Sequence, residues 1–95
     1  MDLSTNVTRI LEVKNKMGIH ARPAAMIVRI TNKYGDTEVM IGPKNETINA
    51  KSIMSIMMLA ASIGTQLTVT AKGFNAQKVV KELSDLFERK FEEGV

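Results

Sequence analysis

Four segments of the chain are predicted to form β-strands. Residues 66–71 alternate strictly between polar and apolar side chains, which predicts a strand with one face on the core and the other in water. In residues 37–41, Thr37, Val39 and Ile41 alternate with Glu38 and Met40, and the turn-rich residues 42–45 separate this run from residues 47–50, so the two segments predict a hairpin. Residues 7–13 form a further β-leaning run whose alternation is imperfect.

Helical spacing marks the segment that follows the first predicted strand. Pro23 must lie in a first helical turn, because an interior position would lose a backbone hydrogen bond, so a helix is predicted to start near His20. Its apolar residues share one face, and it should finish near Lys33, with Gly35 as a left-handed cap.

Two more helices are predicted further along the chain. Ser52 is a good N-cap for a short helix through about Ser62, with Gly64 as its stop. Asn75 can cap a final helix whose apolar residues recur at three- and four-residue spacing. These residues are Val79, Val80, Leu83, Leu86, Phe87 and Phe91.

The order of these elements is strand, helix, strand, strand, helix, strand, helix, which predicts an α+β sandwich with the helices on a single face of one sheet. The 95 residues are enough for one core, and no linker or repeat divides them, so we expect a single domain over residues 1–95. Apolar residues make up 44% and charged residues 24% of the chain, as in ordinary globular proteins.

Cysteine usage and the opening residues bear on the compartment and on metal binding. The chain has no cysteine, which excludes disulfides and thiolate metal sites and suits the reducing cytoplasm. Residues 1–6 have neither a basic region nor an apolar stretch, and no later apolar run reaches membrane-spanning length, so we expect neither secretion nor membrane insertion. His20 is the only histidine, so we predict no metal site and no cofactor.

The basic charge leaves one alternative from another functional class open. A net charge of +3 and the basic residues Arg9, Lys14, Lys16 and Arg22 would suit a small nucleic-acid-binding domain. The sequence has no Gly-x-x-Gly clamp and no paired aromatic residues on a predicted strand, and its four aromatic residues supply a poor base-stacking surface. We therefore expect weak, nonspecific binding to nucleic acid at most.

The segment around His20 carries the most specific chemistry. Neutral imidazole is a nucleophile near neutral pH, and a helix start offers free N–H groups and a positive dipole end to a phosphate. Arg22 adds a permanent cation that can make paired hydrogen bonds to phosphate oxygens. Gly18 permits an unusual backbone before the histidine. These residues favour a phosphoryl acceptor at His20, and a surface or capping histidine is the competing interpretation until a more specific signal is found.

Two motifs resemble those of a known family. Residues 18–24, Gly-Ile-His-Ala-Arg-Pro-Ala, are similar to the active-site signature of HPr, the histidine-containing phosphocarrier of the bacterial phosphoenolpyruvate-dependent phosphotransferase system. Residues 49–54, Asn-Ala-Lys-Ser-Ile-Met, resemble the family's second signature, around a regulatory serine. The distance between the motifs also fits, and the resemblance covers nearly the whole chain.

The resemblance implies an open-faced β-sandwich of four antiparallel strands and three helices. It implies that enzyme I, charged by phosphoenolpyruvate, phosphorylates His20 at Nδ1 and that the phosphoryl group passes to IIA domains of sugar permeases or of regulatory phosphotransfer chains. Arg22 would help to hold the phosphate. Such a protein is a carrier and not an enzyme in its own right, and we expect a cytoplasmic monomer.

The second motif carries the predictions on regulation and docking. Capping of a helix is by itself a sufficient reason for a serine at position 52, and the resemblance adds regulation, because it implies that a serine kinase and a phosphorylase act on Ser52. Family positions matching Ile53, Met54 and Met57 form an apolar docking patch for partners, although burial in the core is the competing interpretation of any one methionine.

Departures from the family pattern leave the pathway open. Ser55 and Ala60 stand where many HPr sequences have glycine, so helix propensity should rise at both positions, and such substitutions resemble the nitrogen-related branch of the family. A regulatory member that acts through Ser52 with His20 idle is a further alternative. The sequence does not identify the acceptor, the sugar or the kinase.

Overall fold

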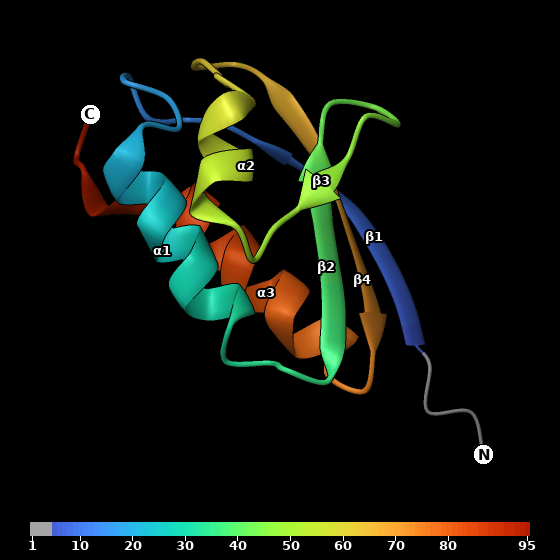
Figure 1. The fold of residues 1–95 in the computed structure, drawn as a ribbon. Coiled ribbons are helices and arrows are strands. Elements are labelled where there is room, and N and C mark those ends of the chain that lie inside the picture. Colours follow the sequence, from blue (N-terminus) through green and yellow to red (C-terminus); the bar gives the residue numbers. More distant parts are fainter. Residues whose placement is uncertain (1–4) are drawn as a thin grey trace.

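The computed structural model describes residues 5–95. The prediction that the opening residues carry no secretion signal concerns residues 1–6, of which residues 1–4 lie outside the described part of the chain. The elements appear in Figure 1 in the predicted order. They are β1 (Thr5–Glu12), α1 (Ala21–Thr31), β2 (Thr37–Gly42), β3 (Ile48–Asn49), α2 (Ile53–Met58), β4 (Gln66–Gly73), α3 (Ala76–Glu88) and a short 3-10 turn, η1 (Lys90–Glu92).

The four strands form one antiparallel sheet in the order β1-β4-β2-β3. The last strand, β4, therefore lies between β1 and β2, so segments far apart in the sequence are paired at the centre of the sheet. The helices all cover one face of the sheet and leave the other open (Figure 1). The predicted α+β open-faced sandwich is confirmed.

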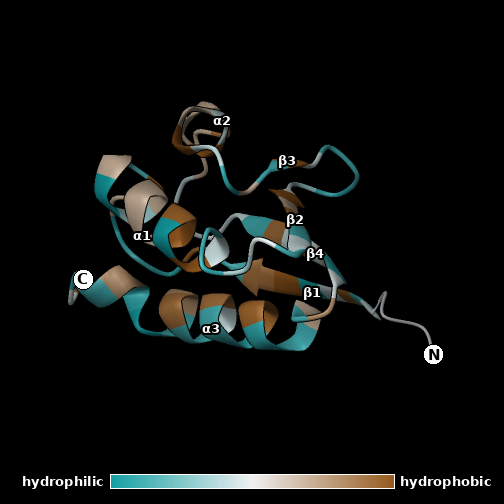
Figure 2. Ribbon diagram, turned by 60° about the horizontal axis from the view of Figure 1, so that its bottom comes forward, coloured by the Kyte–Doolittle hydropathy of each residue, from teal (hydrophilic) through white to brown (hydrophobic). Residues whose placement is uncertain are grey.

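The core lies between the sheet and the amphipathic helices. In β4 the alternate residues Leu67, Val69 and Ala71 are fully buried, as their spacing predicts. The apolar side of α3 faces the sheet and its polar side faces solvent, as the hydropathy colours in Figure 2 show. Among residues 5–95, no helix combines the length and the apolar composition needed to cross a bilayer.

The imperfect alternation in β1 has a structural explanation. Leu11 is buried opposite Leu67 of β4, whereas Ile10, next to it, lies on the open face and is largely exposed. Successive side chains of a strand point to opposite faces, so two adjacent apolar residues cannot both reach the core.

Two of the predicted helix caps are wrong. α1 ends at Thr31, and Gly35 is not in the left-handed conformation, because hydrogen bonds from Lys33 to Ile30 and from Tyr34 to Thr31 close the end with tightened turns. Asn75 stands at the N-cap of α3 as predicted, but its side chain makes no capping bond. That side chain binds the carboxylate of Asp36.

The predicted end of α2 near Ser62 is also wrong, because the helix ends at Met58. Ala60 has φ of +49°, in the left-handed region, so the expected gain in helix propensity at this position does not apply. The loop that follows α2, residues 59–65, is fixed by backbone hydrogen bonds to the segment between β1 and α1. The amide of Ile19 donates to the carbonyl of Ala61, and the amide of Gly64 donates to the carbonyl of Val13. Tertiary contacts thus override local propensity.

The left-handed Ala60 makes a stability prediction. Left-handed backbone costs a non-glycine residue roughly 1–2 kcal/mol, so Ala60→Gly should raise the free energy of unfolding by about 1 kcal/mol after the larger chain entropy of glycine is allowed for. Thermal unfolding should then have a midpoint about 4–8 °C higher. Ala61→Gly is the matched control, because it removes a buried methyl from an ordinary conformation and should destabilise. A lower midpoint for Ala60→Gly would contradict this account.

Candidate functional site

The backbone before α1 is shaped by a glycine. Gly18 has φ of +71°, and a Cβ at this position would lie 2.4 Å from the carbonyl oxygen of Ala61. Only glycine accommodates both the left-handed conformation and this close approach. The loop is thereby pressed against the exit of α2, and His20 follows two residues later as the N-cap of α1, as the sequence predicts.

The start of α1 leaves backbone donors available. His20 is in an extended conformation, and its side chain makes no capping hydrogen bond. The amide of Ala24 donates to the His20 carbonyl at 3.0 Å, so the amides of Ala21 and Arg22 precede the hydrogen-bonded ladder of the helix, and Pro23 has no N–H. The helix therefore presents two amides and its positive dipole end beside the histidine.

The imidazole of His20 lies at the surface with one nitrogen occupied. Its side chain is 34% exposed, and Nε2 lies 2.5 Å from Oε2 of Glu93. Within residues 5–95, no hydrogen bond is formed by Nδ1. One ring nitrogen is thus held by the protein while the other is free to react.

Arg22 lies beside this pair. Its side chain is 54% exposed, and one guanidinium nitrogen donates to the carbonyl of Phe91 at 3.1 Å and lies 3.6 Å from Oε2 of Glu93. The structure therefore places Arg22 near His20, as predicted, but with its guanidinium turned to the C-terminal segment.

Sequence reasoning missed two residues of this cluster, Asn15 and Glu93. The fully buried Asn15 donates from Nδ2 to Oε1 of Glu93 and to the carbonyl of Gly18, both at 2.8 Å. Burial by itself would raise the pKa of Glu93, but the hydrogen bonds from Asn15 and His20 and the nearby cationic groups bring that pKa below its ordinary value. No local pattern signals this contact, because Glu93 lies 78 residues from Asn15.

Ser52 has the predicted capping role. It is the N-cap of α2, and its Oγ accepts a hydrogen bond from the amide of Ser55 at 3.2 Å. Its phosphorylation stays a prediction.

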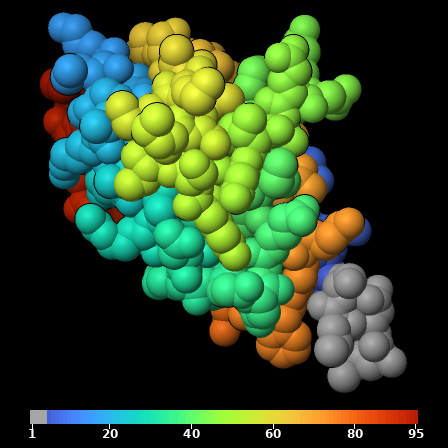
Figure 3. Space-filling view, in the orientation of Figure 1, coloured from blue at the N-terminus to red at the C-terminus, as the bar shows by residue number. Residues whose placement is uncertain are grey.

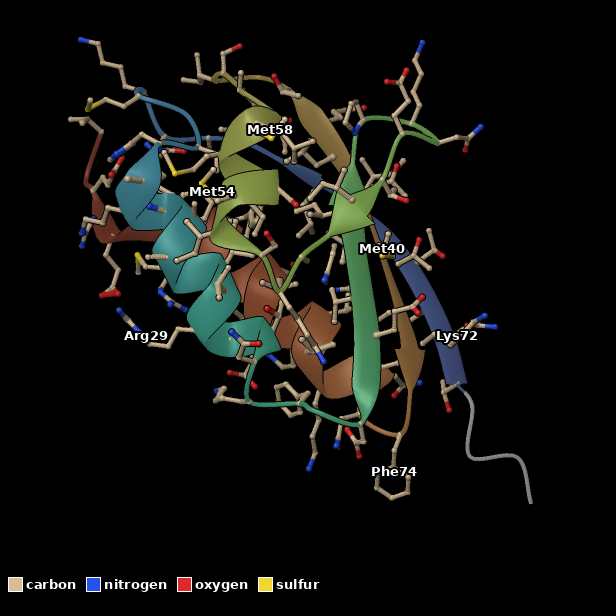
Figure 4. All side chains as sticks on the ribbon, in the orientation of Figure 1. Arg29, Met40, Met54, Met58, Lys72 and Phe74 are labelled. Carbon is tan, nitrogen blue, oxygen red and sulfur yellow. The ribbon has the colours of Figure 1, made fainter. Side chains whose placement is uncertain are left out.

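The apolar residues of α2 form a surface next to the start of α1. Ile53, Met54 and Met57 are all exposed, so the docking patch predicted for them is open to solvent, although its use by partners stays a prediction. Met58 and Met17, which we did not include, are also exposed. Figure 3 shows the α2 side chains gathered on one face beside the start of α1, and Figure 4 shows how Met54 and Met58 extend from this helix.

Two of the four basic residues that would support nucleic-acid binding already contact other groups of the protein. Lys14 forms an ion pair with Glu88 at 2.5 Å, and Arg22 is engaged with Phe91 and Glu93. The described residues also contain no cluster of three potential metal ligands.

Comparison with known proteins identifies the family. The family model described as "PTS HPr component phosphorylation site" matches residues 7–89. A phosphocarrier protein HPr from Treponema pallidum is 37% identical over 87 residues, which cover 92% of this chain and 98% of that protein. A crystal structure of HPr from Thermoanaerobacter tengcongensis matches with a TM-score of 0.84 at 41% identity, over 96% of this chain and 99% of the other.

A second structure from the same organism, described as an HPr dimer, has a TM-score of 0.70 and 42% identity, over 85% of this chain and 92% of the other. These similarities extend over the whole sandwich and include the segment around His20. The family resemblance predicted from the two motifs is confirmed. The chain belongs to the HPr family, the phosphocarrier proteins of the phosphotransferase system.

Proposed function

We propose that His20 accepts a phosphoryl group at Nδ1 from phosphorylated enzyme I and passes it to IIA domains of sugar permeases or of regulatory phosphotransfer chains. One observation carries the proposal. His20 stands at the start of α1 with a partly exposed ring whose Nε2 is engaged and whose Nδ1 forms no hydrogen bond within residues 5–95. The protein would act as a carrier, with its catalytic share limited to being a nucleophile and then a leaving group.

The chemistry of transfer fits this geometry. The lone pair of Nδ1 forms the bond to phosphorus while the bond from phosphorus to its donor breaks, and the donor keeps that electron pair. The phosphoryl oxygens would then lie near the amides of Ala21 and Arg22 and the positive end of α1. Because the Arg22 side chain is half exposed, its guanidinium can turn from the Phe91 carbonyl to the phosphate, a stronger partner.

The exposed apolar surface suits a carrier that must meet several partners. Ile53, Met54 and Met57 lie on α2, which packs against α1, so a protein docked on them would be close to His20. Flexible thioethers adapt to surfaces of different shape. We propose that enzyme I and the IIA domains use this patch in turn.

A two-step relay tests the proposed function. The protein is incubated with enzyme I and labelled phosphoenolpyruvate, separated from enzyme I, and then mixed with a IIA domain. We expect one labelled phosphoryl group per chain, which then moves to the IIA domain. A protein that stays unlabelled, while an HPr from a relative is labelled under the same conditions, would contradict the proposal.

Ser52 provides a second, regulatory proposal. A phosphate on Ser52 would place two negative charges beside Ile53 and Met54, where partner docking must exclude water, and would repel an acidic partner. The helix cap itself would persist, since anionic groups are compatible with a helix start. A serine kinase would thus lower the rate of phosphoryl transfer through His20 without unfolding α2, and a phosphorylase that removes the phosphate would restore that rate.

The charge effect at Ser52 can be separated from the capping effect. Aspartate and asparagine are both good N-caps and differ mainly in charge. We expect Ser52→Asp to accept phosphate from enzyme I roughly tenfold more slowly than Ser52→Asn, because a like charge at a docking surface is costly. Initial rates of labelling at limiting enzyme I measure this. Equal rates in the two variants would rule out repulsion at the interface.

We further propose that the carrier works as a cytoplasmic monomer. Its partners are other proteins, and the site described above is complete within one chain. Sedimentation equilibrium at micromolar concentration should give the mass of a single chain, and a stable dimer would overturn this part of the proposal.

A further inference from the structure

The C-terminal segment closes onto His20 through a set of specific contacts. In Figure 1 the segment that follows α3 runs back beside the start of α1. The Glu93 carboxylate is only 12% exposed, with one oxygen on Asn15 and the other on His20. The backbone amide of Lys16 donates to the carbonyl of Val95 at 2.9 Å, so the segment is anchored beyond Glu93 as well.

The backbone of this segment is held in a costly conformation. Lys90, Phe91 and Glu92 have φ of +55°, +54° and +60°, three successive non-glycine residues in the left-handed region. Left-handed backbone is unfavourable for every residue that carries a Cβ, so the conformation persists only where other contacts determine it. The fully buried ring of Phe91 and the hydrogen bonds of Glu93 supply those contacts. Strain of this kind accumulates at functional sites.

The contact between Glu93 and His20 fixes where the imidazole proton lies. An ionised carboxylate only accepts hydrogen bonds, so Nε2 must carry the hydrogen that joins it to Oε2 of Glu93. In the neutral ring the other nitrogen, Nδ1, then holds the lone pair. Asn15 donates to the second carboxylate oxygen and prevents the carboxylate from turning away.

We infer that Glu93 is a positioning residue for phosphoryl transfer, which holds His20 in the tautomer that reacts at Nδ1 and balances the positive charge that the ring acquires on transfer. This inference rests on the proposed function of His20. When Nδ1 bonds to phosphorus, the ring keeps its hydrogen on Nε2 and becomes cationic, and the carboxylate of Glu93 faces that hydrogen. A carboxylate that orients a histidine in this way is a recurrent device in histidine chemistry.

Two readouts in Glu93→Gln test the inference, with Glu92→Gln as the matched control. Glu92 is the adjacent, exposed carboxylate. A glutamine can accept from or donate to Nε2, so both tautomers become accessible. In the wild type and in Glu92→Gln, ¹⁵N spectra of the neutral ring should show protonation at Nε2 alone, with a downfield, slowly exchanging Nε2 proton. In Glu93→Gln that proton should exchange fast, and the ¹⁵N shifts should move toward an average of the two tautomers.

The second readout is the rate of labelling by phosphorylated enzyme I. Loss of the negative charge that faces the cationic ring should slow Glu93→Gln roughly tenfold, and Glu92→Gln should match the wild type. Glu93→Ala should be slowed at least as much, which guards against a new contact made by glutamine. Normal labelling with unchanged ring spectra in both Glu93 variants would overturn the role of Glu93 and leave the proposed function intact. A wild type that is never labelled would overturn the proposed function, and its ring spectra would still show whether Glu93 fixes the tautomer.

Discussion

Replacing His20 by alanine should abolish acceptance of phosphate from enzyme I, with labelling no higher than in a reaction without the protein. The chain has one histidine and no cysteine, so the substitution removes the only imidazole and leaves no thiol to take its place. The effect should be complete, because the covalent bond to the carrier is itself the function. Labelling under limiting and excess enzyme I measures it.

A second variant excludes loss of structure as the cause. His20→Gln keeps an N–H group that can reach the Glu93 carboxylate but has no nucleophilic ring nitrogen. We expect this variant to unfold within a few degrees of the wild type and to stay unlabelled. Acid-labile phosphate on either folded variant would show that another residue accepts the group.

Replacing Phe91 by alanine should cause the largest loss of stability among the changes considered. The Phe91 ring is fully buried and contacts Phe87, with ring centroids 4.8 Å apart. Truncating a buried phenylalanine costs about 3–5 kcal/mol, and release of the left-handed residues 90–92 offsets part of this loss, which places the expected cost near 3 kcal/mol. The midpoint of thermal unfolding should fall by roughly 12–24 °C.

Phe74→Ala is the matched control for this variant. Phe74 is exposed and projects from the end of the sheet away from α2 (Figure 4), so its loss should change stability by no more than about 0.5 kcal/mol. Phe91→Ala should also release the C-terminal segment, so that labelling slows as in Glu93→Gln. Equal unfolding midpoints for the two variants would mean that Phe91 does not anchor the segment.

Much of this fold could be predicted because its signals are local. The alternation of residues 66–71 identified β4, and Pro23 placed the start of α1 next to His20. The spacing of Val79, Leu83 and Phe87 predicted the buried face of α3. In each case the signal lies within one helix or strand and coincides with burial, so a short stretch of sequence is sufficient to predict the element.

The features that sequence reasoning missed depend on contacts between distant segments. The early end of α2 follows from the left-handed Ala60 and from the bond between Ile19 and Ala61, which no pattern within residues 52–62 reports. In the sequence, Glu93 is indistinguishable from the other charged residues of a polar segment. Only in the folded chain does the left-handed turn bring it to His20. The nucleophile itself could be found, because its motif lies within one loop and one helical turn.

The most direct test of the account is to locate the phosphate on the phosphorylated protein. We predict that, after reaction with enzyme I and phosphoenolpyruvate, ³¹P and ¹⁵N spectra of ring-labelled protein will show a phosphorus bonded to Nδ1 of His20, with Nε2 protonated. Phosphate on Nε2, or on any side chain other than His20, would contradict the account, because the hydrogen bond from Nε2 to Glu93 leaves only Nδ1 to react.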